Sequence, residues 1–261
     1  NRIDERFAKV KADGRKALIT FLTVGDPNME VSEKAIYTMQ EEGVDLIELG
    51  VPFSDPAADG PVIQRADERA LAQGVDIFKV FELVRKIRNN VEVPMVFLLY
   101  YNVMVQYGIE KFFKRCQETG VDGLIIPDLP YEESDEIKEY TEKYGVYQIS
   151  LVSPTSKDRI KNIAKDAKGF LYCISSLGVT GEKSSFVTNF DEFVGTIKKY
   201  TDVPACVGFG VSNGRQVKEL TKYFDGAIVG SAIVKSIATG ESVEERINNL
   251  REKIKDLKSG L

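Results

Sequence analysis

Glu48 and Asp59 are the two residues of this chain whose types and spacing most directly suggest chemistry. Glu48 lies near the end of an apolar run, where a carboxylate is costly unless it is paired or functional. Burial there would raise the pKa of Glu48 and suit it to give and take a proton near neutral pH. Asp59 follows in a loop rich in Pro, Ala and Gly, which can fold a second carboxylate back over the same place.

A plainer interpretation of these residues stays open. In it, Glu48 pairs with a neighbouring Lys or Arg, and Asp55 and Asp59 only cap turns. Gly50 favours the functional interpretation, because it shares Glu48's side of the strand and would leave room there for a ligand.

The sequence contains no histidine. This excludes Ser-His and Cys-His nucleophile pairs, His-ligated zinc and imidazole acid–base catalysis. Proton transfer must therefore use Asp, Glu, Lys, Tyr or Cys. The three cysteines, Cys116, Cys173 and Cys206, are far apart and lack metal-ligand spacing, so we predict buried free thiols and no metal site.

Glycine-rich segments follow three short apolar stretches in the C-terminal half of the chain. They are residues 178–181, residues 208–210 and the pair Gly230-Ser231, and the last opens a short helical stretch over 232–237. Backbone N–H groups at such a helix start can hold an anion without Lys or Arg. The three segments together predict a phosphate site, although turns also use glycine for their own sake.

Five apolar or aromatic side chains lie within or next to short apolar stretches of the sequence. They could line a flat apolar pocket or simply fill a core. They are Phe21, Leu98, Tyr100, Tyr172 and Phe209.

Eight short apolar runs alternate with amphipathic segments along the chain. The runs are 17–24, 45–50, 94–101, 123–127, 147–152, 170–175, 204–208 and 226–230. Near-continuous apolar runs of this length are typical of parallel strands buried on both faces. The helical segments are 3–12, 31–42, 77–88, 109–119, 132–144, 157–168, 213–224 and 243–258.

Eight β/α units in 261 residues predict a (β/α)8 TIM barrel, with an extra N-terminal helix at 3–12 that could plug one end. An open doubly wound sheet is the competing architecture, but residues 23–27 lack its Gly-rich fingerprint. No linker stands out, so we expect one domain over residues 1–261. In such a barrel the chemistry lies where strands end.

The charge and hydropathy of the chain exclude some classes of function. Charges of both signs are mixed along the chain, with a net charge of −5 and no basic block, so nucleic acid is not expected as a partner. Apolar runs are too short to span a bilayer, and the charged N-terminus has no signal-peptide core, which predicts a cytoplasmic protein. Together these features predict a metal-free barrel enzyme, a lyase or isomerase, that moves protons on a small phosphorylated substrate.

Five segments also resemble the tryptophan synthase alpha chain family, in the family's order and with similar spacing. They are residues 21–27, 48–61, 178–181, 208–210 and 230–232, of which 48–61 is the most specific. The resemblance implies retro-aldol cleavage of indole-3-glycerol phosphate to indole and glyceraldehyde 3-phosphate. Glu48 would then protonate indole C3 and help to deprotonate the C3′ hydroxyl, and Asp59 would receive the indole N–H.

The resemblance also implies the binding residues. Phe21, Leu98, Tyr100, Tyr172 and Phe209 match the indole pocket, and Thr180 lies in a loop that closes over the site. The phosphate cradle corresponds to Gly181, Gly210, Gly230 and Ser231.

A partner is implied as well. The family works as an αββα complex whose beta chain carries pyridoxal phosphate, whereas the alpha chain has no cofactor or metal of its own. Pro52 and Asp55 match positions that contact the beta chain. One departure concerns the closing loop, because Ser176 stands where many members have Arg.

Three alternatives remain beside this interpretation. A stand-alone indole-3-glycerol phosphate lyase would release indole without a beta chain, and the intact segment 52–55 favours the complexed form. A catalytically silent barrel that only activates a partner is opposed by the presence of both Glu48 and Asp59. A phosphate-binding isomerase shares the fold, and fold alone does not separate these chemistries.

Overall fold

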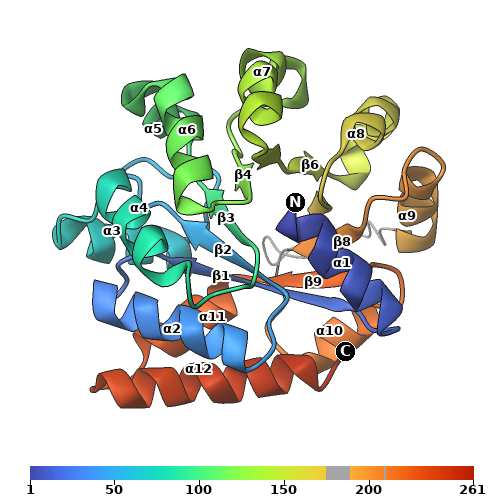
Figure 1. The fold of residues 1–261 in the computed structure, drawn as a ribbon. Helices are drawn as coiled ribbons and strands as arrows, with labels where there is room; N and C mark the ends of the chain where they lie inside the picture. Colours follow the sequence, from blue (N-terminus) through green and yellow to red (C-terminus); the bar gives the residue numbers. More distant parts are fainter. Residues whose placement is uncertain (175–188, 209) are drawn as a thin grey trace.

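The computed structural model describes residues 1–174, 189–208 and 210–261. One sheet of parallel strands forms its centre, and helices surround the sheet (Figure 1). The strands are β1 (Ala17–Thr23), β2 (Leu46–Gly50), β3 (Met95–Leu98), β4 (Gly123–Ile125), β5 (Tyr147–Gln148), β6 (Ser150–Val152), β7 (Leu171–Ile174), β8 (Ala205–Gly208) and β9 (Gly226–Val229). Each predicted apolar run contains strand residues, because a run that is apolar on both sides can be buried on both faces.

The sheet order is β5-β4-β3-β2-β1-β9-β8-β7-β6. The two outermost strands, β5 and β6, are joined only by Ile149, whose N–H donates to the carbonyl oxygen of Leu124 at 2.8 Å. The predicted fifth run is therefore one segment that pairs first with β4 and then with β7. This segment closes the sheet, so the predicted TIM barrel is confirmed.

The helices follow the strands in the order a barrel requires. They are α1 (Arg2–Ala12), α2 (Met29–Glu41), α3 (Pro61–Ala72), α4 (Ile77–Ile87), α5 (Tyr101–Tyr107), α6 (Ile109–Thr119), α7 (Asp135–Tyr144), α8 (Ile160–Asp166), α9 (Phe190–Lys198), α10 (Gly214–Leu220), α11 (Ser231–Ala238) and α12 (Val243–Lys258), with 3-10 turns at Tyr131–Glu133 and Pro154–Arg159. The sequence patterns had not predicted α3, α5 or α9. The buried face of α3 consists of Ala66, Asp67 and Ala70, which explains its weak apolar signal.

Side chains alternate between two cores. One side of each strand faces the helices, and the other faces the barrel interior, as the period of two requires. Ile19, Leu46 and Val96 belong to the interior core, and Ile3, Phe7 and Val10 of α1 pack into it. The predicted N-terminal helix therefore fills the end of the barrel where the strands begin.

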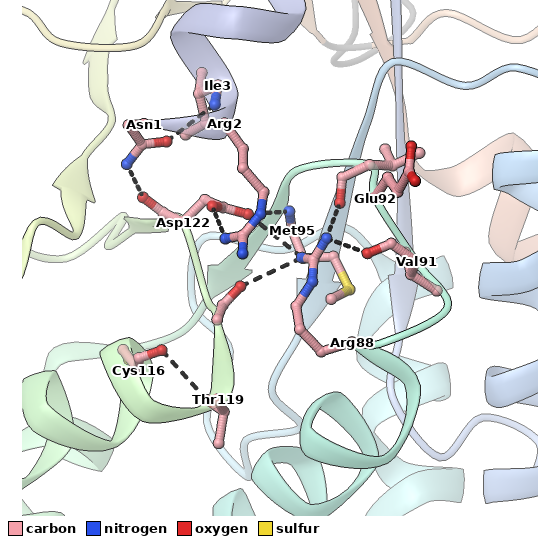
Figure 2. Close-up of polar contacts among 12 residues, drawn as sticks. Asn1, Arg2, Ile3, Arg88, Val91, Glu92, Met95, Cys116, Thr119 and Asp122 are labelled. Atoms are coloured by element: carbon pink, nitrogen blue, oxygen red, sulfur yellow. Dashed lines mark hydrogen bonds and ion pairs between the residues drawn. The ribbon is translucent and has the colours of Figure 1, made fainter.

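That end of the barrel is tied together by aspartates that precede strands. Asp45, Asp122 and Asp225 each accept a backbone N–H at the start of the neighbouring strand, from Leu18, Met95 and Ala205 respectively. Each carboxylate is also paired with a cation. Figure 2 shows the Asp122 cluster, where Arg2 lies 2.9 Å and Arg88 3.5 Å from the carboxylate. The aspartates thus fix adjacent strands far from the predicted chemistry, which lies where the strands end.

Candidate active site

Glu48 lies in β2 and faces the barrel interior, level with Phe21 of β1 and Val96 of β3. Its side chain is 1% exposed, and within the described residues Oε1 has no hydrogen-bond partner. Burial raises the pKa of Glu48 to about 8, and no ion pair to Lys or Arg is found in the described part of the chain. Glu48 is therefore a largely protonated acid at neutral pH rather than one half of a salt bridge.

Asp59 lies just before α3, at the end of the loop that follows β2. The Tyr100 hydroxyl donates to Asp59 Oδ2 at 2.8 Å and accepts the Ala58 N–H at 2.9 Å. The Phe53 ring stacks on the Tyr100 ring with centroids 5.0 Å apart. Burial raises the pKa of Asp59, and the hydrogen bond from Tyr100 partly offsets this shift. Tyr100, which follows β3, thus holds Asp59 in place. Asp59 therefore does more than cap a turn.

Tyr172 of β7 is influenced by the charges of both carboxyl groups. Burial raises the pKa of its hydroxyl, and the charges of both Glu48 and Asp59 raise it further. Tyr172 is therefore near enough to both carboxyl groups for their charges to act on its hydroxyl.

Two glycines leave space for aromatic rings of the candidate site. A Cβ on Gly208 would lie 2.6 Å from the Tyr172 hydroxyl oxygen, and a Cβ on Gly50 would lie 2.5 Å from Cζ of Phe21. The expectation that Gly50 leaves space for a ligand was wrong, because the Phe21 ring occupies that space. Gly50 instead lets this ring lie across the end of β2.

Leu98 and Phe21 pack together in a small cluster with residues of α3 and α11. Phe21 is buried, whereas Leu98 is only partly buried. The structure thus brings four of the five predicted pocket side chains to the end of the barrel that holds Glu48. The fifth, Phe209, lies outside the described residues.

Two of the predicted phosphate residues, Gly230 and Ser231, lie at the start of α11. Gly230 precedes this helix, no side chain caps it, and Ser231 at its first position is exposed. A Cβ on Gly230 would lie 3.7 Å from Phe21, so this helix start adjoins the aromatic side of the site. Gly210 is exposed and has a φ of 73°, which favours glycine. Thr180 and Gly181, with Ser176, lie outside the described residues.

The loop that follows β2 presents its middle to solvent. Asp55 is exposed and accepts from the Ser54 hydroxyl at 2.6 Å, whereas Pro52 is buried. An open hollow of about 370 Å³ separates this part of the loop from α3 and includes Phe53, Asp55 and Leu71 in its lining. Of the two predicted contact residues, Asp55 is the one that a partner can reach directly.

Sequence reasoning missed Asp67 and Thr23. Asp67 of α3 is 4% exposed, and the Thr23 hydroxyl donates to its Oδ1 at 3.3 Å. A signal existed in the sequence: Asp67 stands at helical spacing from Ile63 and Ala70, so an acid lies within an otherwise apolar stripe.

The described residues contain neither a grouped set of metal ligands nor a membrane-spanning helix. Across residues 1–174, 189–208 and 210–261, no three Cys, Asp or Glu side chains are grouped as metal ligands would be. In the same residues, no helix combines the length and the apolar character needed to cross a membrane.

Known proteins resemble this chain over its whole length. The profile of the family described as tryptophan synthase alpha chain matches residues 7–261. The alpha chain of Thermoanaerobacter sp. (strain X514) is 48% identical and covers 100% of both chains. The chain belongs to the tryptophan synthase alpha chain family.

Members of this family from other organisms agree with that assignment. The alpha chain of Methanocaldococcus jannaschii is 47% identical over 90% of this chain and 84% of its own length. A solved structure of tryptophan synthase from M. tuberculosis superposes with a TM-score of 0.88 at 33% identity, covering 100% of this chain and 98% of that one. The alpha subunit from Legionella pneumophila str. Paris gives a TM-score of 0.84 at 34% identity, with 98% of each chain covered.

Proposed function

We propose that this chain is the alpha subunit of tryptophan synthase and cleaves indole-3-glycerol phosphate into indole and glyceraldehyde 3-phosphate. Family membership supports the substrate, and the state of Glu48 carries the mechanism. A protonated, buried and unpaired carboxylic acid at the end of β2 is suited to deliver a proton to carbon.

In the proposed reaction, Glu48 transfers its proton to C3 of the indole ring and so breaks the ring's aromaticity. Positive charge develops on the indole nitrogen, and Asp59 accepts the N–H and stabilises this charge. The carboxylate left on Glu48 then helps to remove the C3′ hydroxyl proton. The C3–C3′ bond breaks, its electron pair returns to the ring, and C3′ becomes the aldehyde carbon of glyceraldehyde 3-phosphate.

The remaining side chains hold the substrate in this proposal. The indole ring would lie against Phe21, Leu98 and Tyr172, with Phe209 completing the pocket. The phosphate group would be held at the start of α11 by Gly230 and Ser231, because backbone N–H groups and the helix dipole favour an anion there. Gly210, Gly181 and Thr180 are proposed to complete this cradle and its cover.

A beta chain is the proposed partner, in an αββα complex that passes indole on for tryptophan synthesis. Exposed Asp55 and the hollow beside it support a contact at the loop that follows β2, with Pro52 shaping the loop from beneath. The alpha chain is proposed to need no cofactor, since pyridoxal phosphate belongs to the beta chain. Free buried thiols at Cys116, Cys173 and Cys206 accord with a reducing, cytoplasmic location.

Indole release from indole-3-glycerol phosphate tests this function, measured for the purified chain alone and with a tryptophan synthase beta chain. Slow release alone and strong activation by the beta chain are expected. Fast release without activation would assign the stand-alone lyase instead. Absence of release in both cases would contradict the proposed activity and leave only a phosphate-binding barrel.

A further inference from the structure

Gln64 of α3 is a polar side chain that the proposed mechanism does not use. It is half-buried, one turn into the helix, and its Nε2 donates to the backbone carbonyl oxygen of Asp59 at 2.8 Å. Asp59 directly precedes Gly60, the N-cap residue of α3, which makes no side-chain hydrogen bond to the helix. Gln64 therefore reaches back past the start of its own helix and holds the main chain of a proposed catalytic residue.

Asp59 is bound at both its main chain and its side chain. Its N–H donates to the Pro56 carbonyl oxygen at 3.0 Å, and its carbonyl oxygen accepts the Gln64 amide. Its Oδ2 accepts the Tyr100 hydroxyl at 2.8 Å. Among the residues that the structure describes, none donates a hydrogen bond to Oδ1. The carboxylate thus keeps one oxygen for a ligand while the rest of Asp59 is fixed.

The contact from Gln64 matters because the backbone next to Asp59 has little restraint of its own. Glycine restricts the backbone less than any other residue, and a Cβ on Gly60 would meet nothing within 4 Å. The orientation of the peptide between Asp59 and Gly60 therefore depends on an outside contact, which Gln64 supplies. Tyr100, at the start of α5, holds the carboxylate, so α3 and α5 together set where Asp59 points.

Stabilisation of the helix start does not account for this contact. A capping side chain accepts from the free backbone N–H groups of the first turn, whereas Gln64 donates to a carbonyl oxygen outside the helix. The Gly60 carbonyl oxygen already accepts the N–H groups of Ile63 and Gln64 at 3.0 and 3.1 Å. The Gln64 side chain thus acts on the loop that follows β2 rather than on α3 itself.

We propose that Gln64 is a positioning residue for the cleavage reaction, which holds the Asp59 main chain so that the carboxylate meets the indole N–H. This inference rests on the proposed function, because it assigns Gln64 to the same reaction. The interaction of Asp59 with the substrate strengthens as positive charge develops on the indole nitrogen. A misplaced Asp59 should therefore lower kcat more than it changes KM.

Gln64→Met and Gln64→Glu test the donated hydrogen bond. Gln64→Met keeps the length of the side chain and removes the N–H donor, and we expect kcat to fall about fivefold with KM changed less than about twofold. Gln64→Glu places a carboxylate oxygen against the Asp59 carbonyl oxygen. We therefore expect a larger loss of kcat in Gln64→Glu, about twentyfold.

Gln117→Met is the matched control. Gln117 of α6 also donates its Nε2 to a backbone carbonyl oxygen, that of Tyr144 at the end of α7, at 3.2 Å. This contact joins two helices and involves no residue of the candidate site. Gln117→Met should lower the melting temperature slightly and leave kcat of the folded protein unchanged. A purely structural role for Gln64 would make Gln64→Met behave in the same way.

The decisive measurement is kcat and KM of indole release for wild type and the three variants at a temperature where all are folded. Gln64 also lines the hollow beside Asp55, so the chain is measured without a beta chain, which keeps changes in partner binding out of the comparison. Reduced kcat in both Gln64 variants, with wild-type kcat in Gln117→Met, is the expected result.

Three results would overturn the positioning role. They are an unchanged kcat in folded Gln64→Met, a loss confined to KM, and an equal loss of kcat in Gln117→Met. Failure of the wild type to release indole would instead overturn the proposed function, so the two failures are distinguishable.

Discussion

At the scale of single residues, burial decides what Glu48 can do. Its Oε1 has no partner among the described residues, and desolvation alone raises its pKa from 4.5 to about 8. The folded chain therefore keeps a proton on Glu48 that the unfolded chain releases at a lower pH. The same property that supplies an acid for the reaction makes ionisation of the folded protein costly.

Stability should consequently fall as pH rises from about 4.5 to about 8. The raised pKa corresponds to a loss on the order of 5 kcal/mol in the free energy of unfolding across this window. Glu48→Gln removes the titration and should be more stable than wild type at pH 8 but not at pH 5. Urea unfolding of both proteins at several pH values checks this, and a pH-independent difference would contradict the assigned pKa.

Tyr100 offers a second residue-scale prediction. Tyr100→Phe keeps the ring that stacks on Phe53 but removes the hydroxyl that donates to Asp59 and accepts the Ala58 N–H. Loss of this interaction should lower kcat about tenfold. Steady-state kinetics of indole release would show it, and wild-type kcat in this variant would mean that Asp59 is positioned without Tyr100.

At the scale of elements, glycines at the ends of strands leave space for aromatic rings of the neighbouring strands. A Cβ on Gly208 would lie 2.6 Å from the Tyr172 hydroxyl oxygen, so Gly208→Ala must displace Tyr172. We expect Gly208→Ala to weaken substrate binding severalfold, measured as KM. Gly195→Ala in α9 is the control, since a Cβ there meets nothing within 4 Å and should add about 1 kcal/mol of stability. Equal KM values in the two variants would remove Tyr172 from the pocket.

The elements also show which features the sequence could predict. Strands were found because their apolar runs are continuous. Gly43, Gly120 and Gly145 follow three of the predicted helices and have a positive φ, as helix-ending glycines do. The division of the fifth strand at Ile149 was not predictable, because it depends on which neighbour each half pairs with. The absence of large apolar residues on the buried face of α3 hid that helix, and with it Asp67.

Some residues of the candidate site could be predicted from the sequence and others could not, for physical reasons. Glu48 and Tyr172 could be predicted because side chains alternate along a strand, so an acid or an aromatic at the right parity must face the interior. The role of Gly50 was wrong because the position of the Phe21 ring depends on a neighbouring strand. Interior packing across strands is not visible in the spacing of one run.

At the scale of the whole molecule, the two ends of the barrel have different roles. Where strands begin, Asp45, Asp122 and Asp225 satisfy backbone donors and pair with cations. Where strands end, the carboxyl groups of Glu48 and Asp59 have no cation partner in the described part of the chain. Aspartates paired with cations thus fix the end where strands begin, and the groups suited to proton transfer lie at the other.

Asp122→Ala tests this division. It removes the acceptor of the Met95 N–H and leaves Arg2 and Arg88 without their carboxylate. We expect a loss of about 3 kcal/mol in the free energy of unfolding and an unchanged kcat in the folded protein. Chemical denaturation and kinetics measure the two quantities, and a reduced kcat in fully folded Asp122→Ala would show that the ends are coupled.

The central claim is that Glu48 moves the proton, and Glu48→Gln tests it most directly. Indole release from indole-3-glycerol phosphate and the affinity for that substrate should be measured together for wild type and variant. The shape of the side chain is retained and its proton is lost, so we predict nearly complete loss of turnover with substrate affinity preserved. Retention of most of the activity would contradict the assignment of Glu48 as the acid and base.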